Sequence, residues 1–326
     1  MALAAVAATG VFAAETAAEK ITTGSPKLVA EAGAREGPSW DPASGILYFV
    51  SGNFVNRLTA EGRVEHFRTN APGANGTLVD PQGRVLVCEA GGRRVTRTEK
   101  DGTLTVLAET FEGKKFNSPN DLALDSKGRI YFTDPRYGRT DTMELRDGAG
   151  KLVEGVYRID APGKITRILA GQIGAAIERP NGILVSPDDR YLYIADNCNN
   201  RADGARKLYR FDLKKDGTVD AASRRLIFDW KTARGPDGFK MDRKGRLYVA
   251  AGLNKASAFE TVDEFKGGVY ILSPEGKLLE FVALPAKDET TNCAFGGKDL
   301  RTLFVTSGDQ LWSVRVKTPG RISARR

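Results

Sequence analysis

The sequence predicts an all-β fold, a six-bladed β-propeller closed into a ring. Three observations lead to this prediction: a strand–turn–strand pattern returns six times, each copy precedes a further strand pair, and no long window has a helical period. Repeats spaced by roughly 40 to 60 residues, each too small to bury its own face, are typical of closed arrays or solenoids. Six units of four strands would make a six-bladed propeller.

The first strand pair of each unit has a polar residue, an apolar strand, a turn centred on Asp, Ser or Gly, and a second apolar strand. The copies are EGPSWDPASGILYFVSG, NGTLVDPQGRVLVCEAG, NDLALDSKGRIYFTDP, NGILVSPDDRYLYIADN, DGFKMDRKGRLYVAAG and NCAFGGKDLRTLFVTSG. Apolar runs between Gly, Asn, Asp and Pro are the signal of strands and hairpins. We therefore expect these segments to form the first two strands of each blade.

The second strand pairs account for the rest of each unit. They are VNRLTAEGRVEHF, RRVTRTEKDGTLTVLAE, GVYRIDAPGKITRIL, KLYRFDLKKDGTVDAASRRLIF, GVYILSPEGKLLEFVAL and the shorter DQLWSVRV. The sixth unit thus ends after three strands, while LVAEAG at Leu28 precedes the first unit and has no partner. We predict that this segment supplies the missing outer strand and closes the ring.

Length and composition agree with a single propeller domain. The 326 residues could form two domains on length alone, but nothing between the repeats is a linker. We expect one domain over residues 20–317 and a tail over 318–326. Residues 1–19 are apolar, Ala-rich and too short to span a bilayer. A small-residue site near Ala13 or Ala14 suggests a secretory signal, although the usual basic start is missing.

The predicted partners and location follow from the same features. With a signal peptide the protein would be periplasmic or secreted, and without one cytoplasmic, and no later segment is a candidate membrane span. The net charge is +8 and the pI about 9.3, but Lys and Arg are scattered rather than clustered. We therefore expect no nucleic-acid partner. A closed ring has no free sheet edges, which favours a monomer.

Cysteine and histidine exclude several kinds of site. Cys88, Cys198 and Cys293 fall in units two, four and six, so neither a disulfide framework nor a zinc site is expected. The only histidine, His66, lies in an outer hairpin. A histidine-based triad is therefore disfavoured, and a catalytic base must be a carboxylate or a metal-bound water.

One residue of each unit, five positions before the turn, always bears a side-chain oxygen. In a propeller the first strands line the central channel, so these residues should meet at one mouth of it. We call them the ring residues: Glu36, Asn75, Asn120, Asn181, Asp237 and Asn292. Two carboxylates and four amides are hard donors that suit Ca²⁺ or Mg²⁺. A wet polar mouth is the alternative, but facing carboxylates are costly unless a cation or a proton lies between them.

Other residues are expected on the same face. Long loops follow the second strand of units three (PRYGRTDTMELRDGAGKLVEG) and five (GLNKASAFETVDEFKGG), and such loops are often functional. Arg136 and Tyr137 are therefore candidates for substrate contact, with solvated side chains as the alternative. Glu89, Asp134 and Asp196 end the second strands, where they could support the ring, bind substrate hydroxyls or cap turns. Pairing of Glu89 with Arg93 or Arg94 is equally compatible with the sequence.

At these residues the chain resembles the gluconolactonase, regucalcin and senescence-marker-protein family, whose relatives include the calcium-dependent diisopropylfluorophosphatase. Four segments match the family's main motifs in order and spacing, and the resemblance covers nearly all of the chain after about residue 28. These segments are EGPSW, PNDLALDSKGRIYFTDP, RPNGILVS and GPDGFKMD.

The resemblance implies a propeller with one divalent cation at the channel mouth, usually Ca²⁺, with Mg²⁺, Mn²⁺ or Zn²⁺ as alternatives. Glu36, Asn181 and Asp237 match the direct ligands, and Asn120 matches a ligand or substrate contact. Asp237 also matches the acid proposed as general base or nucleophile. Asn75 and Asn292 occupy positions that vary in the family and are candidates for substrate contact.

The predicted function is hydrolysis of a sugar lactone or a similar cyclic ester. The cation would polarise the carbonyl, and Asp237 or a metal-bound water would supply the attacking group. An organophosphate hydrolase using the same site and a non-enzymatic, calcium-stabilised binding propeller are the alternatives, and another reaction of sugar derivatives stays open.

Overall fold

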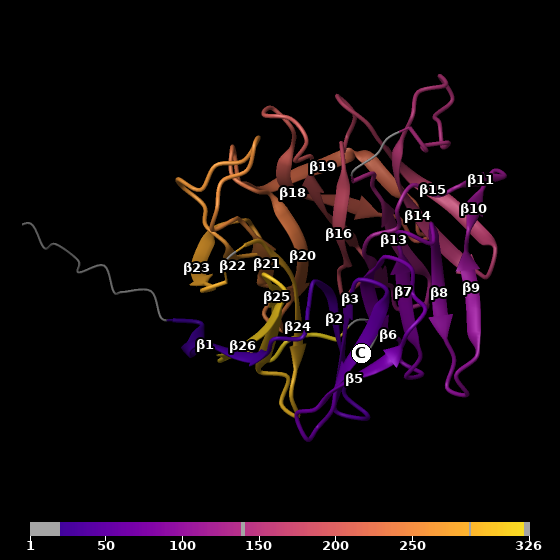
Figure 1. Ribbon diagram of the computed structural model, residues 1–326. Helices are drawn as coiled ribbons and strands as arrows, with labels where there is room; N and C mark the ends of the chain where they lie inside the picture. The colour runs from indigo at the N-terminus through magenta and orange to yellow at the C-terminus, as the bar shows by residue number, and fades with distance from the viewer. Residues whose placement is uncertain (1–19, 138–140, 287, 323–326) are drawn as a thin grey trace, which may run out of the picture.

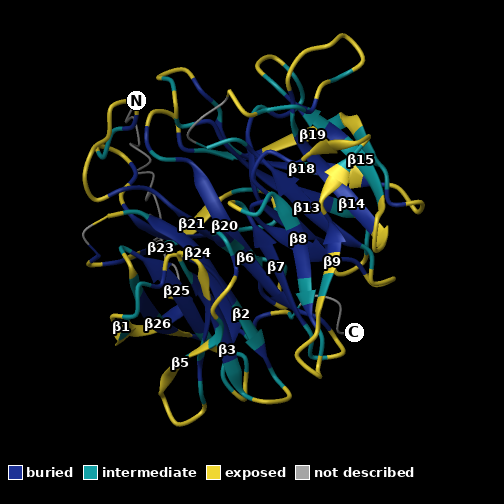
Figure 2. Ribbon diagram, turned by 45° about the vertical axis from the view of Figure 1, so that its right-hand side comes forward, coloured by how far each residue is buried: buried dark blue, intermediate teal, exposed yellow. Residues whose placement is uncertain are grey.

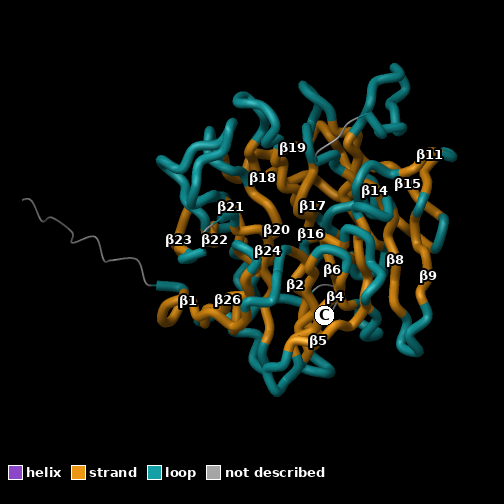
Figure 3. Tube along the Cα trace, viewed as in Figure 1, coloured by secondary structure: helices purple, strands orange, loops and turns teal. Residues whose placement is uncertain are grey.

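Six antiparallel four-stranded sheets are arranged around a central channel, which confirms the six-bladed propeller (Figure 1). The computed structural model describes residues 20–137, 141–286 and 288–322. The expected signal segment, residues 1–19, lies outside the described residues. Within them the chain consists of strands and loops, and no helix occurs (Figure 3). Accordingly, the described residues include no helical segment suited to crossing a bilayer.

Blades one to three follow the expected repeats. Their strands are β2 (Glu36–Asp41), β3 (Ile46–Ser51), β4 (Phe54–Leu58) and β5 (Val64–Arg68); β6 (Ala74–Val79), β7 (Val85–Glu89), β8 (Arg94–Thr98) and β9 (Leu104–Ala108); β12 (Leu122–Leu124), β13 (Ile130–Asp134), β14 (Glu154–Ala161) and β15 (Lys164–Gly171). A short hairpin that the repeats do not predict joins blades two and three, formed by β10 (Thr110–Phe111) and β11 (Lys114–Lys115).

Blades four to six complete the ring. Their strands are β16 (Pro180–Val185), β17 (Tyr191–Asn197), β18 (Arg206–Leu213) and β19 (Val219–Asp229); β20 (Pro236–Met241), β21 (Leu247–Ala251), β22 (Gly268–Leu272) and β23 (Leu278–Ala283); β24 (Thr290–Gly296), β25 (Thr302–Ser307), β26 (Gln310–Val316) and β1 (Thr22–Ala30).

The ring closes with the first strand of the chain, as the sequence predicts. β1 pairs antiparallel with β26 and forms the outer strand of blade six, with Leu28 opposite Trp312. Glu280 of β23 fixes the start of β1, because its carboxylate accepts hydrogen bonds from the backbone N–H (3.1 Å) and the hydroxyl of Thr22. The N-terminal strand is therefore tied to both blade six and blade five.

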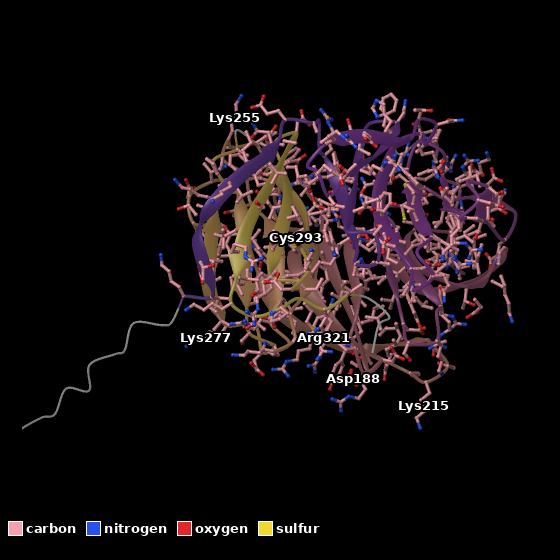
Figure 4. All side chains as sticks on the ribbon, turned by 90° about the horizontal axis from the view of Figure 1, so that it is seen from below. Asp188, Lys215, Lys255, Lys277, Cys293 and Arg321 are labelled. Carbon is pink, nitrogen blue, oxygen red and sulfur yellow. The ribbon has the colours of Figure 1, made fainter. Side chains whose placement is uncertain are left out.

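Residues 318–322, the described part of the expected tail, pack against the end of the channel opposite the ring residues. The backbone N–H of Gly320 donates to the carbonyl of Leu300 (2.8 Å), and that of Arg321 donates to the carbonyl of Met241 (2.9 Å). Residues 318–322 thus connect blades five and six at this end of the channel, and Arg321 is labelled in Figure 4.

The core lies between neighbouring blades. The second strands are buried on both faces, as in β7, where every residue is buried, because each blade is covered by the next. The fourth strands form the rim and are much more exposed, as in β23, where Val282 is the single buried residue (Figure 2). All three cysteines are free and buried, and Cys293 lies in the interior in Figure 4, whereas Lys215, Lys255 and Lys277 lie at the periphery.

A repeated turn joins the first two strands of three blades. In the segments DPQGR, DSKGR and DRKGR the Asp carboxylate accepts two backbone N–H groups of the turn and the Nε of the Arg four residues later. At Asp242 the bonds to Lys244 N, Arg246 N and Arg246 Nε are 2.8, 3.0 and 2.7 Å, and the Tyr248 hydroxyl adds a fourth at 3.2 Å. One carboxylate therefore satisfies four donors.

We expect Asp242→Ala to lower the free energy of unfolding by about 2–3 kcal/mol, because the substitution leaves several donors, one of them charged, without an acceptor. Asp188→Ala is the matched control, since the Asp188–Arg190 pair is largely exposed (side chains 47% and 70%) and should contribute less than about 1 kcal/mol. Urea unfolding of both variants measures the difference. Equal losses would contradict the structural role given to the Asp242 carboxylate.

Candidate active site

Five of the six ring residues line one cavity at the mouth of the channel. The cavity has a volume of about 710 Å³, and its wall includes Glu36, Asn75, Asn120, Asn181 and Asp237. Each lies within two residues of the start of the innermost strand of its blade, as the repeat alignment predicts. Asn292 lies behind this wall, where its Nδ2 donates to Glu36.

Glycine allows the inner strands to approach one another this closely. Four ring residues are followed by glycine: Glu36, Asn75, Asn181 and Asp237. A Cβ on Gly182 would lie 2.1 Å from the carbonyl oxygen of Asp237, and one on Gly238 would lie 1.9 Å from Cγ of Asn292. No other residue fits such contacts. The glycine after the ring residue therefore brings neighbouring ring residues together.

Glu36 is held through one of its two oxygens. Its Oε2 accepts the backbone N–H of Gly37 (2.9 Å) and Nδ2 of Asn292 (3.0 Å). Burial raises the pKa of Glu36 well above its usual value, the negative charge of Asp237 adds to the shift, and the bond from Asn292 opposes it. The two ring carboxylates therefore repel each other, as expected from the sequence.

Asp237 is held in the same way by an arginine that the repeat alignment does not single out. Nη2 of Arg234 donates to Oδ2 of Asp237 (2.9 Å) and also contacts Oε2 of Glu289 (2.8 Å). Burial raises the pKa of Asp237 to about 7, and Arg234 limits the rise. The ring itself has no Lys or Arg, but Arg234, three residues before Asp237, lines the cavity. In the sequence, the arginine three residues before the ring residue in RGPDG could have indicated this contact.

The asparagines are positioned by side-chain and backbone contacts. Nδ2 of Asn181 donates to the hydroxyl of Tyr137 (2.8 Å), which also lines the cavity. The backbone of Asn120 donates to the carbonyl of Thr133 (2.9 Å) and accepts the N–H of Gly76 (2.7 Å). Oδ1 of Asn75 is buried and has no hydrogen-bond partner in the described structure.

Asp121 is a further buried carboxylate that the repeat alignment did not identify. Its Oδ1 accepts the backbone N–H of Leu122 (2.9 Å), while its Oδ2 is buried and takes no hydrogen bond within the described residues. Burial raises the pKa of Asp121, and the positive charge of Lys240 opposes this. Its own charge in turn raises the pKa of Glu36 and of Asp237.

The donor set fits a hard divalent cation. Each of Glu36, Asn181 and Asp237 has one side-chain atom engaged by protein, which leaves Oε1, Oδ1 and Oδ1 respectively without a donor among the described residues. Three such oxygens and the unpartnered amide of Asn75 are ligands that Ca²⁺ and Mg²⁺ prefer. No group of three or more His, Cys, Asp or Glu side chains among the described residues is arranged to hold a metal ion, so a cation site at the ring would also use asparagine amides.

Two carboxylates expected near the ring, Asp134 and Asp196, accept hydrogen bonds from backbone N–H groups. Asp134 accepts the backbone N–H groups of Asn117 and Ser118 (2.9 and 2.8 Å). Asp196 accepts those of Glu178 and Arg179 in the equivalent place (2.9 and 2.8 Å). Neither carboxylate lines the cavity. Asp134 and Asp196 instead hold the segments that lead into Asn120 and Asn181.

Glu89 and Arg136 also lie outside the cavity wall. Glu89 is fully buried and binds Arg68, Arg94 (2.8 Å) and Thr96 (2.6 Å), so of the two pairings considered the one with Arg94 is formed. Arg136 contacts the carbonyl of Asn117 (3.4 Å) and the hydroxyl of Thr142 (2.7 Å). Both side chains therefore have partners within the protein, and neither lines the cavity.

His66 lies on β5, where its Nδ1 contacts Oδ1 of Asn56 (2.7 Å) and its ring stacks on Phe54. It is not among the cavity-lining residues. This placement agrees with its expected position in an outer hairpin. The cavity wall has no histidine among the described residues and includes the carboxylates of Glu36 and Asp237.

Comparison with known proteins agrees with this architecture. Residues 34–309 match the family described as SMP-30/Gluconolactonase/LRE-like region. The chain is 31% identical over 304 residues to a gluconolactonase of Zymomonas mobilis, covering 87% of this chain and 79% of that protein. It is 30% identical over 277 residues to regucalcin of Sus scrofa, covering 83% and 82%.

A solved gluconolactonase from Xanthomonas campestris superimposes with a TM-score of 0.70 at 28% identity, covering 89% of both chains. The propeller, the glycine-spaced ring residues and these similarities together show that the chain belongs to the SMP-30/gluconolactonase/LRE-like family.

Proposed function

We propose that the protein is a metal-dependent hydrolase that opens a sugar lactone or a similar cyclic ester. The observation that carries this proposal is the convergence of Glu36, Asn181 and Asp237 on one 710 Å³ cavity, each with one oxygen left without a protein donor. The similarity to gluconolactonases along most of the chain supports the choice of substrate.

Glu36, Asn181 and Asp237 would hold one divalent cation, with Asn120 as a further ligand or a substrate contact. Ca²⁺ is our first candidate, because an all-oxygen donor set with several neutral ligands suits it better than a metal that prefers thiolate or imidazole. When bound, the cation supplies Lewis-acid polarisation of the lactone carbonyl.

Asp237 is the residue to which we assign proton transfer. Burial raises its pKa to about 7 without a cation, and a cation bound to the same carboxylate would lower it, so the assignment rests on the position of Asp237 in the cavity wall. It would take a proton from the attacking water as the new C–O bond forms. When the ring C–O bond breaks, the same proton passes to the departing alkoxide, and the product is the open-chain hydroxy acid.

The surrounding residues orient this carboxylate. Arg234 binds Oδ2 of Asp237 and is itself held by Glu289, and its side chain is only 11% exposed. With Oδ2 engaged, Oδ1 is left for the cavity. Because Arg234 acts on Asp237 from within the wall, the arrangement is preorganised before substrate enters.

The test is the rate of hydrolysis of glucono-1,5-lactone and a panel of small lactones, measured above the spontaneous rate. Chelator-stripped protein should be inactive, and added Ca²⁺ should restore turnover by at least about 100-fold. Tight Ca²⁺ binding without turnover of any lactone would contradict the lactonase proposal. Turnover of an organophosphate instead would reassign the chemistry of the same cavity.

A further inference from the structure

Tyr137 stands out among the cavity-lining residues because its hydroxyl contacts a candidate cation ligand. The hydroxyl accepts a hydrogen bond from Nδ2 of Asn181 (2.8 Å) and donates one to the backbone carbonyl of Asn197 (3.2 Å). Its single proton is thus directed to a carbonyl, which leaves a lone pair for the amide. A tyrosine hydroxyl is protonated at neutral pH, so it has one proton to donate.

The ring of Tyr137 is fixed as well as its hydroxyl. The guanidinium of Arg179 lies 5.3 Å from the ring centroid, within the range of a cation–π contact. Arg179 is held by Glu154 through two hydrogen bonds of 2.8 and 2.9 Å. The same carboxylate accepts the backbone N–H of Arg136 (2.7 Å). Glu154 therefore fixes both the arginine beneath the ring and the chain immediately before Tyr137.

This arrangement selects one of the two orientations of the Asn181 amide. A side-chain amide can present either its oxygen or its NH₂ group to a neighbour, and the partner decides which. Because the hydroxyl proton of Tyr137 goes to Asn197, only the NH₂ group of Asn181 makes a favourable contact with it. Oδ1 of Asn181 is then directed away from the tyrosine, and both residues line the same cavity.

We propose that Tyr137 is a positioning residue that orients the Asn181 amide so that its oxygen serves as a cation ligand. This inference rests on the proposed function, because it assigns Asn181 to the cation site. It gives the long connection of blade three a defined role, since the start of that loop sets the geometry of a ligand on blade four. The sequence predicted a substrate contact for Tyr137, whereas the hydrogen bonds give it a partner in the protein.

The experiment measures Ca²⁺ affinity of the full chain by isothermal titration calorimetry, independently of turnover. Tyr137→Phe removes only the hydroxyl and should weaken Ca²⁺ binding about 10-fold, the loss typical of a partner that orients a metal ligand. The melting temperature of the metal-free variant should stay within about 2 °C of the wild type. Tyr191→Phe is the matched control, because Tyr191 lies away from the cavity wall with its ring against Arg210, and its Ca²⁺ affinity should be unchanged.

A double-mutant cycle shows whether Tyr137 acts through Asn181. In an Asn181→Ala background, Tyr137→Phe should cause no further loss of Ca²⁺ affinity. Wild-type affinity in Tyr137→Phe, or losses that multiply in the double variant, would overturn the proposal. So would an increase in KM for lactone at saturating Ca²⁺ with unchanged affinity, because that pattern indicates direct substrate contact.

The outcomes separate this inference from the proposed function. If the wild type binds Ca²⁺ but hydrolyses no lactone, the lactonase proposal fails while calorimetry still decides the role of Tyr137. If lactone hydrolysis is Ca²⁺-dependent but Tyr137→Phe binds Ca²⁺ normally, only the inference about Tyr137 fails. A wild type that binds no divalent cation overturns both.

Discussion

Asp237→Asn is expected to lower kcat/KM for lactone hydrolysis by about 1,000-fold, because it removes both a charged cation ligand and the proton acceptor. The substitution preserves the shape of the side chain, so the effect measures chemistry rather than packing. Ca²⁺ affinity should fall together with activity. Steady-state assays at saturating Ca²⁺ separate the two contributions, since the loss of the base persists when the site is full.

The metal-free Asp237→Asn variant should be at least as stable as the metal-free wild type, although its activity is lower. Burial raises the pKa of Glu36 and the negative charge of Asp237 raises it further, because the two carboxylates repel each other when both are ionised. Neutralising Asp237 removes this repulsion, although it also weakens the bond to Arg234, so the metal-free melting temperature should be unchanged or higher. Asp299→Asn makes the same chemical change at an exposed pair with Arg315 away from the cavity and should keep full activity. If Asp237→Asn retains more than a tenth of wild-type kcat/KM, Asp237 is not the proton acceptor.

Calcium affinity is expected to rise with pH through about 7, the pKa to which burial raises Asp237. A carboxylate must lose its proton to ligate, and burial raises the pKa of Asp237 to about 7 and that of Glu36 well above its usual value. For each proton that the cation displaces, the affinity should increase up to about 10-fold per pH unit. Calorimetry at pH 5, 6, 7 and 8 measures this slope.

The stability of the metal-free protein should instead decrease as the pH rises. A folded-state pKa above the unfolded value means that the folded state binds more protons, so stability falls as pH rises from about 4 through 7. The gap between the melting temperatures of calcium-saturated and metal-free protein should therefore widen with pH. Asp237→Asn should reduce this widening. A gap that stays constant from pH 5 to 8 would show that the cavity carboxylates are already ionised without a cation.

The sequence was sufficient to predict the ring, because each blade repeats the same strand and turn. Glu36, Asn181 and Asp237 occupy equivalent places along the repeat, and alignment alone brings them together. Closure by the segment at Leu28 could also be predicted, since the sixth unit lacked one strand. These properties depend on position along a strand, which periodicity reports directly.

Contacts between repeats were beyond the reach of the alignment. Arg234 and Tyr137 reach the cavity from connections whose conformation is not repeated, so the alignment does not single them out. The length of its loop pointed to Tyr137 but not to its hydrogen bond with Asn181. Asp134 and Asp196 were placed on the correct face, but their carboxylates bind backbone N–H groups. Strand periodicity predicts the face of the propeller on which a carboxylate lies. It does not predict which hydrogen-bond donors surround that carboxylate.

Closure of the ring by β1 has a consequence for how the cavity assembles during synthesis. Glu36 lies in the first blade and its partner Asn292, 256 residues later, in the last, so their hydrogen bond crosses the seam between the two ends of the chain. β1 must wait for β26 before it can pair. Contacts between such distant residues form late in folding. A ribosome-bound chain that lacks its final strands would therefore hold an incomplete cavity, and activity would begin only when the last blade has been made.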